Sequence, residues 1–181
     1  MRKVSGFIGA VVLIVALAAC SASNPQTSAS QAAASRTVAV AACTQVGTKH
    51  FAKTRFLLHS GLGIGAFRHF VYTPFKAGKF KSGAQGRVKA MIIAGAAALF
   101  TYHELKTAKK FAEANKTLCK LVAPIDKLTA ALPGLGSGLK SGKLNDAGIN
   151  GAAQNVASFK GSATRLGTPI TERVPPSVGV P

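Results

Sequence analysis

Residues 91–100 read MIIAGAAALF, and this run of small and apolar side chains lies at the centre of the segment that decides the fold. The segment, residues 87–118, is expected to be a long helix. Glu113 lies four residues after Lys109 and three before Lys116, an ordinary solvated pairing on a helix surface. The alanines and the glycine at its centre leave room for another backbone to approach closely.

A first helix is expected over residues 48–72, stopped by Pro74. Its apolar residues fall on most faces of the helix, which indicates that the helix is buried. Gly61, Gly63 and Gly65 weaken the helix but allow close approach, so we expect them to face the centre of the second helix.

Helical spacing of leucine, valine and isoleucine continues over residues 118–132. Pro124 either kinks this stretch or begins a new helix, and Pro133 with Gly134 is expected to end it. Residues 134–143 are expected to form a mobile connection.

A last amphipathic helix is expected after Asn145 or Asp146, either of which is a good N-cap residue. Its apolar residues recur at helical spacing along one stripe: Ile149, Ala152, Val156, Phe159 and Ala163. Strand signals are weak throughout, so the predicted fold is all-α, a small bundle of about four helices over residues 36–168. The Pro-rich residues 169–181 are expected to be a disordered tail.

The charge balance excludes several kinds of site. The chain has 23 Lys plus Arg against 5 Asp plus Glu, a formal net charge of +18, and the first acid is Glu104. Two-carboxylate hydrolysis, Ca²⁺ loops and most Mg²⁺ sites need clustered carboxylates. The 48% hydrophobic content argues against a disordered polyelectrolyte.

The N-terminus has the features of an export signal. Arg2 and Lys3 precede an apolar run over residues 7–19, which is shorter than a membrane-spanning helix. The run ends Leu17-Ala18-Ala19-Cys20. This tetrapeptide resembles the lipobox of bacterial lipoproteins. The alternative is an ordinary secretory signal cut nearby, with Cys20 incidental.

The lipobox resemblance implies a signal peptide over residues 1–19 and lipidation of Cys20. It also implies that the protein is anchored to the outer face of the bacterial cytoplasmic membrane. Residues 20–35 are Ser-, Ala- and Gln-rich without charge, and read as a flexible tether.

If Cys20 carries lipid, Cys43 and Cys119 remain. In an oxidising compartment a disulfide between them is expected, and closing so long a loop would contribute roughly 4 kcal/mol. Two free buried thiols are the alternative.

Residues 75–89, FKAGKFKSGAQGRVK, form the most distinctive segment, with five positive charges, three glycines, two phenylalanines and no acid. Cations and exposed backbone N–H groups suit anions. The candidate anion-binding residues are Lys76, Lys79, Lys81, Arg87 and Lys89. The alternative is a solvated loop whose phenylalanines fill the core.

No catalytic residues, metal site or cofactor are expected. The four histidines, His50, His59, His69 and His103, lack the spacing of a shared metal site. Gly61 begins a dinucleotide-like motif without the preceding strand. The acids are too few to orient a histidine, so the sequence does not predict an enzyme.

We therefore expect a lipid-anchored, non-catalytic envelope protein whose basic face contacts anionic lipid, wall polymer or an acidic protein. One alternative is an extracytoplasmic module for nucleic-acid binding or adhesion. Another is a small-molecule or haem carrier, with a pocket lined by His59, His69 or Tyr72.

Overall fold

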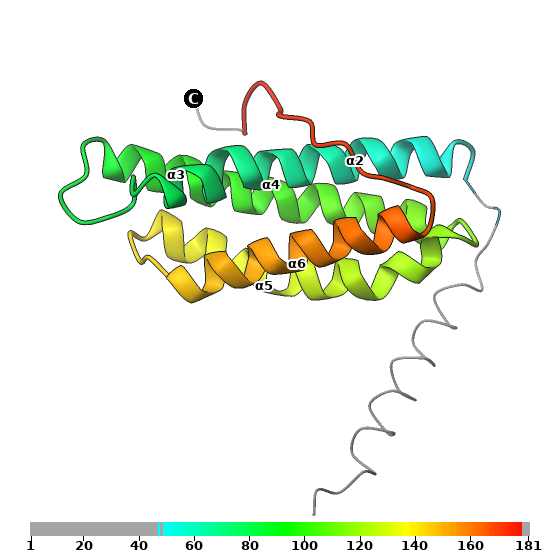
Figure 1. The fold of residues 1–181 in the computed structure, drawn as a ribbon. Coiled ribbons are helices and arrows are strands. Elements are labelled where there is room, and N and C mark those ends of the chain that lie inside the picture. The colour runs from blue at the N-terminus through cyan, green and yellow to red at the C-terminus, as the bar shows by residue number, and fades with distance from the viewer. Residues whose placement is uncertain (1–46, 48, 179–181) are drawn as a thin grey trace, which may run out of the picture.

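The described part of the chain, residues 47 and 49–178, is built from α-helices in this computed structural model (Figure 1). Within these residues there is no strand, which confirms the predicted all-α class. The predicted signal peptide, the lipidation site Cys20, the tether over residues 20–35 and Cys43 lie outside the described residues. None of the described helices is long and apolar enough to cross a membrane. The elements in chain order are α2 (Ala52–Ala66), the π-helical η1 (Phe67–Tyr72), α3 (Thr73–Lys76), α4 (Arg87–Glu113), the 3-10 helix η2 (Leu118–Leu121), α5 (Val122–Lys140) and α6 (Asp146–Arg165).

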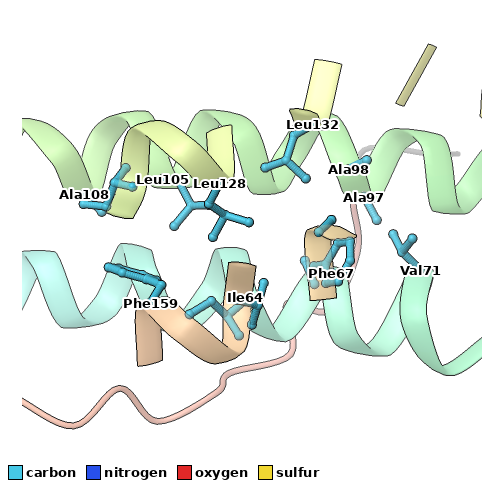
Figure 2. Packing of buried hydrophobic residues seen from close by; sticks show 14 of the residues in the cluster. Ile64, Phe67, Val71, Ala97, Ala98, Leu105, Ala108, Leu128, Leu132 and Phe159 are labelled. Atoms are coloured by element: carbon cyan, nitrogen blue, oxygen red, sulfur yellow. The ribbon is translucent and has the colours of Figure 1, made fainter. Parts of the chain in front are cut away.

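Helix α4 is the centre of the bundle and packs against both α2 and α5, while α6 packs against α5. The core between these helices is almost entirely aliphatic and aromatic (Figure 2). Burial of such side chains is the main driving force of folding. Side chains that are less than 2% exposed come from every long helix: Ile64, Ala97, Ala98, Leu105, Ala108, Leu128, Leu132 and Phe159.

The first helix continues past Pro74, where the sequence predicted that it would stop. A proline inside a helix cannot donate to the carbonyl four residues earlier, and its ring collides with that carbonyl. The chain avoids this collision because the helix widens into the π-helical η1 just before the proline. There the N–H of Thr73 donates to the carbonyl of Arg68, five residues earlier. The helix therefore reaches Lys76 as α3.

The glycines of α2 contact two different neighbours, which corrects the expectation that all three face α4. Gly63 does face α4, since a Cβ there would lie 3.2 Å from Cβ of Glu104. Gly61 and Gly65 share the opposite face, four residues apart. A Cβ on Gly61 would lie 2.5 Å from the carbonyl oxygen of Thr171, in the C-terminal segment.

Helix α5 runs on through Pro133 to Lys140, so the expected end at Pro133 and the mobile connection over residues 134–143 are wrong. The reason is contact between distant residues. A Cβ on Gly136 would lie 3.1 Å from the carbonyl oxygen of Gly95, so the two glycines let α4 and α5 cross closely. Leu135 and Leu139 are buried beside this crossing. Tertiary contacts thus stabilise a segment whose own helix propensity is low.

Residues 168–178 follow a defined course over the bundle, in contrast to the disordered tail expected from their composition (Figure 1). The backbone N–H of Arg173 donates to the carbonyl of Gly61 at 3.0 Å. Ile170 and Val178 are 6% and 7% exposed. The C-terminal segment therefore buries apolar side chains against the helices.

Helix α6 agrees with its prediction. Asn145 is the N-cap, and its side-chain oxygen accepts the backbone N–H of Gly148 at 2.8 Å. All five residues of the predicted apolar stripe are buried. Pro124 begins a new helix rather than kinking one, because it lies in the first turn of α5, where its missing N–H has no helical partner to lose.

Candidate functional site

The predicted anion-binding segment lies at one end of the bundle, in the loop over residues 77–86 between α3 and α4 (Figure 1). The loop over residues 141–145, between α5 and α6, lies at the same end. Arg87 joins the two loops: its Nε donates to the carbonyl of Phe80 at 2.9 Å and its Nη2 to the carbonyl of Gly142 at 3.2 Å. Arg87, a candidate anion ligand, thus holds this end of the bundle together.

The phenylalanines of this segment lie inward. Phe80 is 1% exposed and belongs to the core, and Phe75 is half-buried against it. The Phe80 ring therefore has no free face for stacking on a base or for insertion into a bilayer, and the Phe75 ring is partly covered by the core. In this respect the segment agrees with the alternative in which its phenylalanines fill the core.

The lysines of the segment are exposed, and two further lysines that the sequence did not point to lie at the same end of the bundle. Six lysines at this end of the bundle are exposed, and we call them the distal cationic surface: Lys76, Lys79, Lys81, Lys89, Lys140 and Lys143. Within the described residues none of the six has a carboxylate within salt-bridge distance. The last two come from the C-terminal end of α5 and the loop after it, and no sequence pattern joins them to residues 75–89.

Apolar side chains are exposed next to these lysines. Val88 and Ile92 lie one turn apart on α4 and are 68% and 41% exposed. They line an open hollow of about 630 Å³ together with Arg87 and Lys89. This surface therefore combines positive charge with exposed apolar side chains, a combination typical of interaction sites.

The opposite end of the bundle, where the described chain begins, is also basic but contains carboxylates. There Lys109 donates to Asp126 at 2.6 Å and lies 3.9 Å from Glu113. The positive charge is therefore not confined to the N-terminal half of the chain. What distinguishes the distal cationic surface is that its lysines are unopposed.

A histidine is oriented by an acid in the structure, which corrects the expectation that the acids are too few for this. Nδ1 of His59 lies 2.7 Å from Oε2 of Glu104, within hydrogen-bonding distance. The His59 ring stacks on the Phe111 ring, with the two centroids 5.7 Å apart, and the guanidinium of Arg55 also lies over the Phe111 ring. Glu104 therefore fixes the His59 ring against α4. Among the described residues no group of three His, Cys, Asp or Glu could hold a metal ion.

Cys119 is buried in η2, at the end of the bundle where the described chain begins. Its expected disulfide partner, Cys43, lies outside the described residues. The N–H of Gly47, four residues after Cys43, donates to the carbonyl of Ala114 at 3.2 Å. The pairing of Cys43 with Cys119 stays a prediction.

A second charged cluster, which the sequence did not indicate, joins η1, α6 and the C-terminal segment. The carboxylate of Glu172 accepts from Nη1 of Arg68 at 3.1 Å and from Nζ of Lys160. Burial alone would raise the pKa of Glu172, but the hydrogen bonds and charges of Lys160 and Arg68 outweigh burial and lower this pKa below its ordinary value.

These three side chains border a cavity that Tyr72 also lines, whereas His59 and His69 do not line it. Of the residues predicted to line a small-molecule or haem pocket, the structure therefore places only Tyr72 at this cavity.

The comparisons found no protein-family model, no curated protein and no solved structure that matches the chain.

Proposed function

We propose that this chain is a lipid-anchored protein of the bacterial cell envelope that binds rather than catalyses, and that its distal cationic surface contacts anionic lipid headgroups. The anchor rests on the lipobox Leu17-Ala18-Ala19-Cys20. The observation that carries the binding role is the set of exposed, unopposed lysines around two exposed apolar side chains, Val88 and Ile92.

This combination favours a lipid surface over other polyanions. Lysines near an anionic membrane contribute about 1 kcal/mol each. Val88 and Ile92 can enter the boundary between headgroups and acyl chains, which a purely polar polymer does not offer. Single-stranded nucleic acid is bound largely by stacking on aromatic rings, and Phe75 and Phe80 are turned inward. The nucleic acid alternative becomes an outcome of the test.

The test measures binding to vesicles. The chain after the signal peptide, with Cys20→Ser so that no lipid is attached, is sedimented with vesicles of phosphatidylcholine, with and without phosphatidylglycerol. We expect binding only to the anionic vesicles. Replacing Lys79, Lys81 and Lys89 by Gln should weaken it by about 3 kcal/mol, more than a hundredfold in affinity.

A matched control removes the same charge from the other end of the bundle. Lys110, Lys116 and Lys120 are also exposed, and their replacement by Gln should leave most of the binding intact. Equal losses in the two triple variants would mean that net charge alone drives binding and would contradict the assignment. So would equal binding to neutral vesicles, or tighter binding of duplex DNA than of anionic vesicles at the same salt concentration.

The anchor has its own test. Mass spectrometry of the unaltered protein should find a diacylated N-terminal cysteine. A wash at high salt, which removes binding through lysines, should release Cys20→Ala from the membrane but not the unaltered protein. A Cys20→Ala protein that stays on the membrane at high salt would contradict the lipobox assignment, whatever the vesicle experiment shows.

A further inference from the structure

The cavity between η1 and α6 has the size of a small-molecule site. Its volume is about 570 Å³, within the range of roughly 300–1,000 Å³ typical of ligand pockets. Its α6 wall runs from Asn150 to Lys160, ten residues or about 15 Å of helix. The cavity is therefore elongated, with a cation at one end of this wall and an amide at the other.

The middle of the cavity is largely apolar. Phe67 and Val156, both almost fully buried, line it together with Ala153 and Ala157. Tyr72 adds an aromatic ring from η1. This lining suits an apolar chain, whose transfer from water is favourable over its whole buried area.

The charged end of the cavity has more donors than its own acceptor uses. Arg68 and Lys160 share the single carboxylate of Glu172. A guanidinium has five N–H donors and an ammonium has three. Of the three nitrogens of the Arg68 guanidinium, only Nη1 bonds the Glu172 carboxylate, which Nζ of Lys160 also bonds. Since Arg68 is 63% exposed, another anion can reach it from solvent. The three side chains together keep a net positive charge.

The carboxylate of Glu172 lies at the charged end of the cavity, and Glu172 itself belongs to a segment without helix or strand. It belongs to residues 168–178, which lie on the bundle through the close contacts at Gly61 and Gly65. The Glu172 carboxylate can therefore leave the two cations without breaking any helix. It occupies the place that the head of an anionic ligand would take.

We infer that this cavity binds an amphiphilic anion, whose carboxylate or phosphate replaces Glu172 on Arg68 and Lys160 and whose apolar chain lies along η1 and α6. The site is separate from the distal cationic surface and does not depend on the proposed function. Glu172 then acts as an internal competitor that keeps the cations paired when the ligand is absent.

Calorimetric titration tests the inference, with the chain after the signal peptide carrying Cys20→Ser. Decanoate and decyl phosphate are the probes, used below the concentrations at which they form micelles, and decanol is the uncharged comparison. We expect one site per chain for at least one of the two anions, with decanol bound at least tenfold more weakly. The tighter of the two anions identifies the preferred head group.

Variants separate this site from general charge effects. Lys160→Gln or Arg68→Gln should weaken binding by about tenfold to a hundredfold, the usual loss for a hydrogen bond to a charged group. Glu172→Gln should strengthen it several-fold, a gain that misfolding cannot produce. The matched controls at the opposite end of the bundle, Lys120→Gln and Glu113→Gln, should change nothing.

Three results would overturn the inference. They are the absence of saturable binding for both anions, equal binding of decanol, and weaker rather than stronger binding by Glu172→Gln. The first two would mean that the cavity does not take an amphiphilic anion. The third would mean that Glu172 contacts the ligand instead of competing with it.

Discussion

Replacing Gly65 by Ala should detach the C-terminal segment from the bundle. A Cβ at this position would fall on the backbone of Arg173, closer than any real contact allows, and backbone cannot swing away as a long side chain can. The substitution alone would gain roughly 0.8–1 kcal/mol, since Ala is the better helix former. The steric effect must therefore be separated from this gain.

The loss can be bounded from the contacts that hold the segment. Exposing Ile170 costs roughly 1.5–3 kcal/mol, and the hydrogen bond from Arg173 to Gly61 contributes about 1 kcal/mol. After the helix gain, Gly65→Ala should lower the free energy of unfolding by about 1.5 to 3 kcal/mol. The backbone entropy that the freed segment regains makes the loss smaller, whereas exposure of Val178 makes it larger.

The assay pairs urea unfolding with limited trypsin digestion, which cuts after Arg173 once the segment is free. Gly151→Ala is the matched control, because a Cβ there meets nothing within 4 Å, and it should raise stability by roughly 0.5–1 kcal/mol. If Gly65→Ala gains stability like the control and keeps Arg173 protected, the contact between the segment and α2 is refuted.

Three further predictions concern single interactions. The pKa of Glu172 is lowered in the folded chain, so its ion pairs stabilise the fold at neutral pH, and this stability is lost as the pH falls through the lowered pKa. Glu172→Gln should therefore make the free energy of unfolding fall less steeply towards acid pH. An unchanged acid limb would contradict the ion pairs. Mass analysis without reductant should find Cys43 joined to Cys119, whereas alkylation of both thiols would exclude the bond. The buried hydroxyl of Thr101 lies 2.8 Å from the carbonyl oxygen of Ala97 and 2.9 Å from that of Gly63, and its one proton serves these two acceptors. Thr101→Val should therefore lower the free energy of unfolding in urea by about 1 kcal/mol, and Thr101→Ser should lower it by less, since it keeps the hydroxyl.

The parts of the fold that could be predicted are those whose signal is local. The N-cap Asn145 and the stripe of α6 follow from side chains within a few residues of one another, and both agree with the structure. The end of α5 could not be predicted in this way. Pro133 and the following glycines have low helix propensity, and what keeps them helical is the contact of Gly136 with Gly95, some forty residues earlier.

The same reasoning applies to the candidate sites. The lysines of residues 75–89 could be recognised because they are neighbours in sequence, although only the structure separates Arg87, which bonds two carbonyls, from the free cations. Lys140 and Lys143 join them only through the fold. Glu172 lies more than a hundred residues from Arg68, and no periodicity or motif connects the two.

The shortage of acids is what makes both proposed sites possible on one small bundle. Three of the five carboxylates, Glu113, Asp126 and Glu172, are held in ion pairs away from the distal end. Glu104 lies within hydrogen-bonding distance of His59, and Asp146 begins α6. In the described chain only three Lys or Arg side chains lie within 4 Å of a carboxylate: Arg68, Lys109 and Lys160. The six lysines of the distal cationic surface are not among these three, so their charges are available to an external anion such as a lipid headgroup. Where a carboxylate does serve two cations, as Glu172 does, one positive charge is still left over, and that residual charge is what makes the cavity a site for an anion.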